Sequence, residues 1–128
     1  MERKPVSSGA LWEPLVDYSR AVRVGQGISV AGTTAAAEGG GAVGGDDIGE
    51  QAREALRRIA AALHEAGAEL EHVVRTRIFV TDISRWEEIG RAHGERFTAI
   101  RPAATMVQVA ALIDPALMVE IEVEAILE

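Results

Sequence analysis

The stretch from Arg101 to Glu128, RPAATMVQVAALIDPALMVEIEVEAILE, decides the fold of this chain. It contains two strand-like runs, at 104–111 and 118–126, and a connector around Asp114 and Pro115 joins them. The second run alternates strictly between acidic and aliphatic residues, which is the period-two pattern of a strand buried on one face. The sequence therefore predicts two C-terminal strands, the last with one apolar and one acidic face.

The acidic face of the last strand carries Glu120, Glu122 and Glu124. Neighbouring carboxylates on one strand face lie roughly 6.5–7 Å apart and repel one another unless water, a cation or a basic partner relieves them. The simplest interpretation is a solvated strand face. If this face lines a cleft instead, one of the carboxylates becomes a candidate general acid or base.

Length and composition predict one packed domain over residues 1–128. Hydrophobic residues make up 48% of the chain, as in globular proteins. The 20 acidic and 13 basic residues give a net charge of -7, which argues against nucleic acid as a partner because phosphate binding needs a concentrated positive surface. The absence of cysteine excludes disulfides and thiolate nucleophiles.

The sequence contains no run with the features of a membrane or secretory segment. The N-terminal residues lack the apolar core of a signal peptide, and no run approaches the ~18 apolar residues of a membrane span. We therefore expect a soluble, cytoplasmic protein that does not bind membranes.

The N-terminal half alternates short strands with irregular segments. Residues 1–17 are expected to be irregular, and two strands, at 20–24 and 28–31, flank a glycine turn. Residues 35–46 form a glycine-rich segment with no Gly-Lys-Ser/Thr ending for a phosphate. We expect a flexible connector there, because nothing in the sequence pins it.

Two amphipathic helices are predicted, with a strand at 71–80 between them. The first begins after Asp47, which can cap it, with Glu50 three residues later as in a capping box. It ends before Gly67 and has apolar residues spaced by three and four positions. The second begins at Ser84, with Glu87 completing a capping box.

The strand at 71–80 carries Arg75 and Arg77 on one face, together with Phe79. In so acidic a chain, these arginines are natural partners for the glutamate face of 118–126. We therefore predict that the two faces lie on the same side of the sheet.

The predicted order is β-β-α-β-α-β-β, which favours an α+β fold with both helices on one face of a mixed sheet. The other sheet face has no helix to cover it, although it is expected to carry apolar groups such as Phe79 and Met106. An uncovered face of this kind usually finds another subunit. We therefore expect a homo-oligomer with its clefts at subunit boundaries.

No nucleophilic triad is visible, and none of the three histidines, His64, His72 and His93, lies in a metal-binding motif. His93 is interpreted as a structural residue on a helix face, because no second histidine sits at ligand spacing. The residue chemistry alone therefore predicts no metal site.

Five segments, however, occur together in an order that resembles a known family. They are 18–22 (YSRAV), 28–32 (ISVAG), 74–82 (VRTRIFVTD), 101–110 (RPAATMVQVA) and 119–126 (VEIEVEAI). Together they resemble the Rid (YjgF-type) family of reactive-intermediate deaminases, also labelled L-PSP endoribonucleases. The resemblance implies a chorismate-mutase-like fold and a homotrimer that binds small molecules in three intersubunit clefts.

The resemblance also implies an activity and a set of site residues. The best-known members of the family hydrolyse enamines and imines to a keto acid and ammonia, without a metal or organic cofactor. Carried over position by position, the family tyrosine falls on Tyr18 and the glycine that lines the cleft falls on Gly32. The glutamate that orients or activates the attacking water falls on Glu122.

This chain departs from the family pattern at its anion clamp. The family motif Pro-Ala-Arg-Ser/Thr carries an arginine that binds the substrate carboxylate, but that position is Ala104 here, and the often-cysteine position that follows is Met106. Losing such a pair weakens the binding of a 2-imino acid by ~100-fold or more. Three explanations compete. Arg77, or less favourably Arg101, takes over the binding of the substrate carboxylate. Alternatively, the substrate lacks a carboxylate, or the deaminase chemistry is lost.

Three functions follow from the sequence. The first is a hydrolase or deaminase for enamines, imines or related metabolites, with a substrate range altered by Ala104. The alternative is a non-catalytic homotrimer that binds or senses a metabolite. Ribonuclease activity is disfavoured by the net charge of -7 and by the absence of a histidine pair or metal site.

Overall fold

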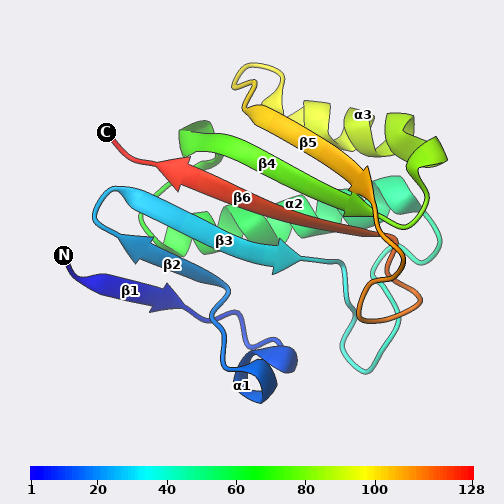
Figure 1. The fold of residues 1–128 in the computed structure, drawn as a ribbon, viewed down its shortest axis with the longest axis horizontal. Coiled ribbons are helices and arrows are strands. Elements are labelled where there is room, and N and C mark those ends of the chain that lie inside the picture. Colours follow the sequence, from blue (N-terminus) through cyan, green and yellow to red (C-terminus); the bar gives the residue numbers. More distant parts are fainter.

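A computed structural model describes all 128 residues as a six-stranded mixed sheet with two long helices on one face (Figure 1). The strand order is β1-β2-β3-β6-β4-β5, and β4–β5 is the only parallel pair. The elements are β1 (Arg3–Val6), α1 (Trp12–Val16), β2 (Ala21–Val24), β3 (Gly27–Thr33), α2 (Ile48–Glu65), β4 (Val73–Val80), α3 (Trp86–Phe97), β5 (Ala103–Gln108) and β6 (Val119–Ile126). The predicted α+β class, with both long helices on one face, is confirmed.

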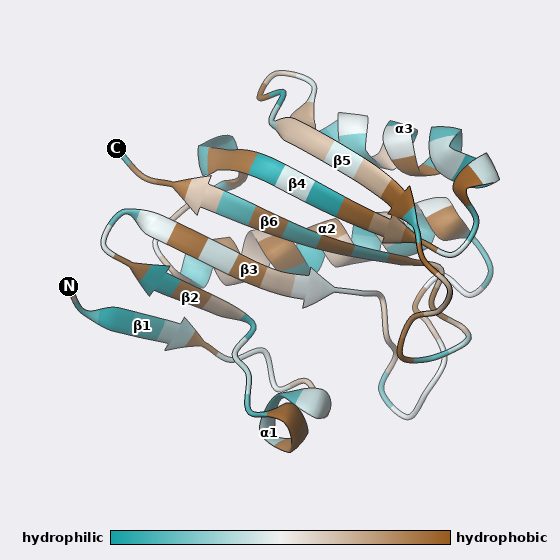
Figure 2. Ribbon diagram, viewed as in Figure 1, coloured by the Kyte–Doolittle hydropathy of each residue, from teal (hydrophilic) through white to brown (hydrophobic).

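β6 lies in the middle of the sheet, between β3 and β4, and runs antiparallel to both (red in Figure 1). Its aliphatic residues Val119, Ile121 and Val123 are buried. Its glutamates face the opposite side, and Figure 2 shows the resulting alternation of polar and apolar residues along the strand. The helices pack against the aliphatic side, so the acidic side faces away from the core.

α2 forms because its apolar stripe, its N-cap and its C-terminal glycine agree. The carboxylate of Asp47 accepts a hydrogen bond from the backbone N–H of Glu50 at 3.1 Å. Gly67 ends the helix with φ of +90°, a conformation that glycine adopts without strain. The predicted capping box is half formed, because the Glu50 side chain binds Arg53.

α3 starts two residues later than predicted. Asp82, not Ser84, caps this region, and its carboxylate accepts hydrogen bonds from both the backbone N–H and the hydroxyl of Ser84. A 3-10 turn over Ile83–Arg85 follows, and α3 begins at Trp86.

The prediction that residues 1–17 are irregular is wrong, because this segment contains a strand and a short helix. Residues Arg3–Val6 form β1, which pairs antiparallel with β2, and α1 follows at Trp12–Val16. The strand has only four residues and contains Pro5, which an edge strand tolerates because one side of it needs no ladder partner. So short a strand leaves no period-two signal.

The glycine-rich segment 35–46 is held by more contacts than its composition predicts. The guanidinium of Arg58, on α2, donates hydrogen bonds at 2.9 Å to the carbonyl oxygens of Thr34 and Ala36. Within the segment, the N–H of Val43 donates to the carbonyl of Ala35 at 2.7 Å. The expectation that nothing pins this connector is therefore wrong, because the restraint comes from a side chain on α2.

None of the helices combines the length with the apolar character that crossing a membrane requires.

Candidate functional site

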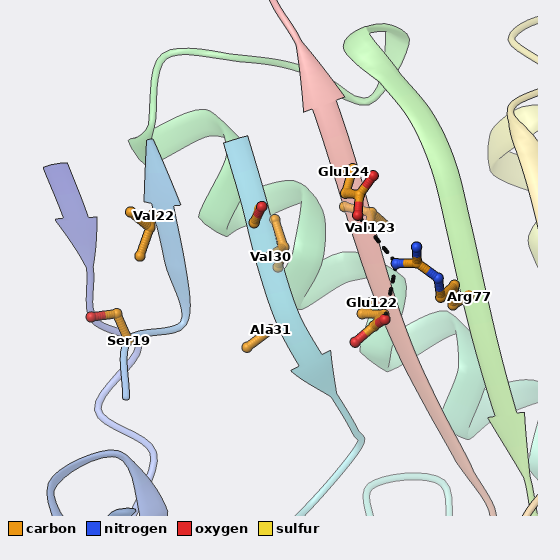
Figure 3. Close-up of a pocket in the computed structure, with 9 residues that line it drawn as sticks. Ser19, Val22, Val30, Ala31, Arg77, Glu122, Val123 and Glu124 are labelled. Carbon is orange, nitrogen blue, oxygen red and sulfur yellow. Dashed lines mark hydrogen bonds and ion pairs between the residues drawn. The ribbon is translucent and has the colours of Figure 1, made fainter. Parts of the chain in front are cut away.

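On the helix-free face of the sheet, Arg77 of β4 binds two glutamates of β6. Its Nη1 atom lies 3.2 Å from Oε1 of Glu122 and 3.2 Å from Oε1 of Glu124 (Figure 3). Arg77 is also the register partner of Glu122 across the two strands. The predicted pairing of the arginine and glutamate faces is confirmed.

A shallow hollow of about 270 Å³ lies over this ion pair. Its lining comes from four neighbouring strands and from Ser19, two residues before β2. It comprises Ser19, Val22, Ser29, Val30, Ala31, Arg77, Glu122, Val123 and Glu124. Two carboxylates and a single guanidinium line it, so its local charge is negative. The hollow is better suited to a neutral or cationic group than to an anion.

Glu120, the third glutamate of the acidic face, has no such partner. Burial raises the pKa of its carboxyl above the usual 4.5, and the nearby Glu122 adds to the rise, while Arg20 opposes it. No hydrogen bond from another group of the chain holds the carboxylate in its charged form. Glu120 is therefore the acidic side chain of this face that is best suited to exchange a proton.

Gly32 provides the surface on which Glu120 rests. A Cβ atom at Gly32 would lie 2.8 Å from Cδ of Glu120, closer than real Cβ contacts come, and 3.1 Å from its Oε1, which is tighter than most such contacts. Between Val30 and Thr33 the register of β3 on β6 shifts, so β3 holds one extra residue there. This bulge and the missing side chain let the carboxyl lie against the backbone of Gly32.

Tyr18 is connected to Gly32 through Arg20. The guanidinium of Arg20 donates to the Tyr18 hydroxyl at 3.2 Å and to the carbonyl oxygen of Gly32 at 2.7 Å. It also lies over the Tyr18 ring, 5.5 Å from the centroid. The structure thus brings the predicted residues Tyr18 and Gly32 together and adds Glu120 to them.

Ala104 and Met106 lie away from this group of residues, on β5. On β5 they are the register partners of Thr76 and Ile78, whose side chains are buried on the helix side of the sheet. Arg77 and the glutamates occupy the opposite face. Within one chain, the structure therefore does not bring Ala104 and Met106 together with the acidic cluster. The expectation that Met106 lies on the helix-free face is wrong, because its side chain packs against the core on the helix side.

The two arginines considered as replacement clamps differ in their surroundings. Arg77 is shared between two carboxylates, as described above. Arg101 is exposed at the entrance of β5, with a left-handed backbone φ of 53°. Neither arginine forms a free anion site with Ala104 in the single chain.

The sequence pattern alone does not distinguish Glu120 from the glutamates two and four residues later. All three lie on one face of the strand, and the period-two pattern makes each of them an equally good candidate for proton transfer. The distinguishing signal is the glycine at position 32, whose contact with Glu120 depends on the pairing of β3 with β6. Glu122, the residue predicted from the family pattern, is the one that faces Arg77.

His93 lies on the helix side, away from this site. Its Nε2 is 2.9 Å from the hydroxyl oxygen of Thr76, and its ring packs against Phe97 at 4.6 Å between centroids. Burial lowers the pKa of His93 below 6.5. These contacts support a role in packing, as the sequence predicted.

Comparison with known proteins places this fold and site in one family. The family model described as Endoribonuclease L-PSP matches residues 9–127. A crystal structure of a Mycobacterium tuberculosis member of the YjgF/YER057c/UK114 family is 56% identical, with a TM-score of 0.90, over 98% of this chain and all of that one.

Two curated relatives extend the comparison. An uncharacterised protein of Streptomyces coelicolor is 38% identical over 120 residues, which are 94% of this chain and 89% of the relative. A human protein named 2-iminobutanoate/2-iminopropanoate deaminase is 28% identical over 110 residues, or 86% of this chain and 80% of that protein. The fold and these matches define an α+β protein of the YjgF type. The chain belongs to the Endoribonuclease L-PSP family, also called YjgF or Rid, as its sequence pattern indicated.

The raised pKa of Glu120 predicts that Glu120→Gln stabilises the protein at neutral pH. A carboxyl whose folded-state pKa exceeds its unfolded value favours the folded state at low pH and loses that contribution as pH rises through the folded-state pKa. The variant should therefore unfold at a higher urea concentration than the wild type near pH 7, with the gain vanishing below about pH 4.

Glu124→Gln is the matched control for this experiment. It removes a carboxylate from the same strand face, but one that forms an ion pair with Arg77. It should show no gain at neutral pH. Equal stabilities of wild type and Glu120→Gln across the pH range would contradict the raised pKa.

Proposed function

We propose that this protein hydrolyses small imines or enamines to a carbonyl compound and ammonia, with Glu120 as the proton-transfer group. The observation that carries the proposal is the half-buried, unpaired carboxyl of Glu120 on the backbone of Gly32, which Arg20 links to Tyr18. The deaminase name of the human relative supports the same reaction class.

The reaction needs a group that first accepts and then returns a proton. Water adds to the carbon of the protonated C=N bond and loses a proton to the Glu120 carboxylate, which gives a neutral carbinolamine. Glu120 then returns this proton to the nitrogen, the C–N bond breaks as the C=O bond forms, ammonia leaves, and the hydroxyl proton passes to Glu120 and from there to water. A carboxyl whose pKa lies above its usual value serves both steps better than an ordinary surface glutamate.

The substrate that fits this site best has no carboxylate of its own. Ala104 supplies no positive charge, and Arg77 is already shared between two glutamates. The glutamates favour a neutral imine or a cationic iminium, and they repel a 2-imino acid. Of the three explanations for Ala104, the absence of a carboxylate from the substrate therefore has the strongest support.

We further propose that the working form is a homotrimer with its ligand in intersubunit clefts. β5 is an edge strand whose residues are largely exposed, and the helix-free sheet face beside it carries Val107 and Phe79. A neighbouring copy that packs against this face and around the open edge of β5 would bring Ala104 and Met106, which lie at that edge, close to the Glu120 of another subunit. The cleft would then contain every predicted substrate-binding residue.

The second candidate function is metabolite binding without turnover. The replacement of the family arginine by Ala104 is the observation that favours it, because a carboxylate clamp is part of the family's chemistry. Ribonuclease activity, which the family description names, has less support, because the net charge is -7 and no cluster of three or more metal-ligating side chains occurs.

A panel of imines tests the hydrolase proposal and the choice of glutamate. Amine and amino-acid oxidases generate the imines in the assay, and the release of ammonia is measured with and without the protein. We expect acceleration for imines without a carboxylate, a loss of about 100-fold or more in kcat for Glu120→Gln, and a smaller loss for Glu122→Gln.

No acceleration with any imine, combined with ligand-dependent thermal stabilisation, would favour the binding protein. If Glu122→Gln abolishes turnover and Glu120→Gln does not, the proton-transfer role belongs to Glu122, as the family pattern predicted.

Ala104→Arg tests the missing clamp. The side chain at this position is exposed, so an arginine fits there, and a new bidentate pair should improve the KM for a 2-imino acid by about 10- to 100-fold. Ala103→Arg is the matched control, because it adds the same charge one residue away on the opposite sheet face. Equal improvement in both variants would mean that general electrostatics, not a clamp, is responsible.

The mass of the particle in solution tests the assembly. We expect light scattering to give three times the mass of one chain, and Val107→Arg to lower it by placing a charge on the proposed contact face. Val43→Arg is the control, since Val43 is 43% exposed against 42% for Val107 but lies in the glycine-rich segment. A monomeric wild type would remove the intersubunit cleft.

A further inference from the structure

A buried pair of opposite charges, Glu13 and Arg20, lies behind the proposed site. These residues are only 5% and 6% exposed, and Oε2 of Glu13 is 4.0 Å from Nη2 of Arg20. Removing two charges from water costs several kcal/mol per ion unless hydrogen bonds and mutual attraction offset the cost. The contacts of each partner therefore indicate what the pair does.

Glu13 is held by the segment that precedes it. Its carboxylate accepts hydrogen bonds from the hydroxyls of Ser7 and Ser8 and from the backbone N–H groups of Ser8 and Ala10. Although burial opposes ionisation, the hydrogen bonds from Ser8, Ala10 and Ser7 lower the pKa of Glu13 below its usual value. Glu13 is therefore an anion fixed in place by residues that the sequence pattern had suggested were irregular.

Arg20 directs its donors toward the proposed site. Nη1 donates to the Gly32 carbonyl at 2.7 Å and to the Thr33 hydroxyl at 3.1 Å, and Nη2 donates to the Tyr18 hydroxyl at 3.2 Å. Nε donates to the Ser8 hydroxyl at 3.3 Å, and that hydroxyl donates in turn to Glu13. One guanidinium thus connects the N-terminal segment with Tyr18 and with Gly32, the residue against which Glu120 lies.

Stability alone does not account for this arrangement. Apolar side chains of similar volume often replace a buried ion pair without loss of stability. What they cannot do is fix the direction of the Gly32 carbonyl and the Tyr18 hydroxyl, or place a positive charge beside the Glu120 carboxyl. The planar guanidinium supplies both the hydrogen-bond fork and the charge.

We propose that Arg20, held by Glu13, is a positioning residue of the site: it fixes Gly32 and Tyr18 so that Glu120 meets its substrate in a single geometry. The catalytic part of this proposal rests on the proposed imine hydrolysis. Arg20 is not assigned a contact with the substrate, because each of its three nitrogens already donates to a group of the chain.

The first test compares Arg20→Met with Arg20→Lys in the imine assay. Arg20→Met should lower kcat by about 10- to 100-fold with a smaller change in KM, because Gly32 and Tyr18 lose their fixed positions. The acid limb of its pH profile should move to higher pH, since removing the cation raises the pKa of Glu120. Arg20→Lys should restore the pH profile through its charge but not kcat, because an ammonium lacks the planar fork.

Arg23→Met is the matched control, because it removes a nearby arginine that lies in β2 and outside the site. Arg23 donates to the carbonyls of Gly25 at 2.9 Å and Ala66 at 2.8 Å, and neither belongs to the site. The control should lose stability while keeping the wild-type pH profile. If Arg20→Met unfolds cooperatively and keeps wild-type kcat and pH profile, the positioning role is overturned.

A second test does not depend on turnover. Titration of the carboxyl carbons of 13C-labelled glutamate by NMR gives the pKa of Glu120 directly. Arg20→Met should raise it, and Glu13→Gln should lower it, because the charge of Arg20 is then no longer balanced. If the wild type hydrolyses no imine, the proposed function fails. Separately, a Glu120 pKa that is the same in the wild type and in both variants would overturn the positioning role.

Glu13→Gln also provides the test if Arg20→Met does not fold. It retains the Arg20 side chain and removes only the anion that holds it. An unchanged Glu120 pKa together with wild-type kinetics in Glu13→Gln would overturn the role of the pair, whereas a lowered pKa with reduced kcat would support it.

Discussion

The whole structure depends on one strand, β6, that must bury its aliphatic side and accommodate three carboxylates on the other. The helices cover the aliphatic side, and this packing fixes the glutamates on the helix-free face, where like charges repel. The chain relieves that repulsion in two different ways. Arg77 neutralises Glu122 and Glu124 across the β4–β6 pair, whereas Glu120 keeps its proton more readily because it is half-buried against Gly32.

This difference gives the acidic face its chemical character. A carboxylate that shares a guanidinium is already engaged in an ion pair, while a partly desolvated carboxyl without a partner is available for proton transfer. Leaving such a group unpaired reduces stability, and proteins commonly accept that cost at functional sites. The buried Glu13–Arg20 pair follows the same logic, since it places two ions in the interior where apolar groups would fill the space.

Membership of the Rid family and the local geometry together define what is distinctive about this chain. The fold agrees with the family, and the resemblance places the family glycine on Gly32, the tyrosine on Tyr18 and the position of the anion clamp on Ala104. Arg77, on the acidic sheet face, is occupied by two glutamates. A cleft built from these groups is acidic, and the proposed preference for substrates without a carboxylate follows from that charge.

The sequence by itself determined the helices and most of the sheet, because period-two alternation, apolar stripes and the caps at Asp47 and Gly67 are local signals. It also assigned Arg77 to one face of its strand and the glutamates to one face of theirs, since alternation sorts the residues of a strand between two faces, and the pairing of β4 with β6 brought those faces together. Only the tertiary structure decided which glutamate stands apart, because the contact of Glu120 with Gly32 arises from a bulge between strands some ninety positions apart in the chain. The same holds for β1 and for Arg20, whose partners lie in segments too short or too irregular to leave a periodic signal. Alternation specifies the face on which a side chain lies, and the pairing of distant strands specifies its neighbours.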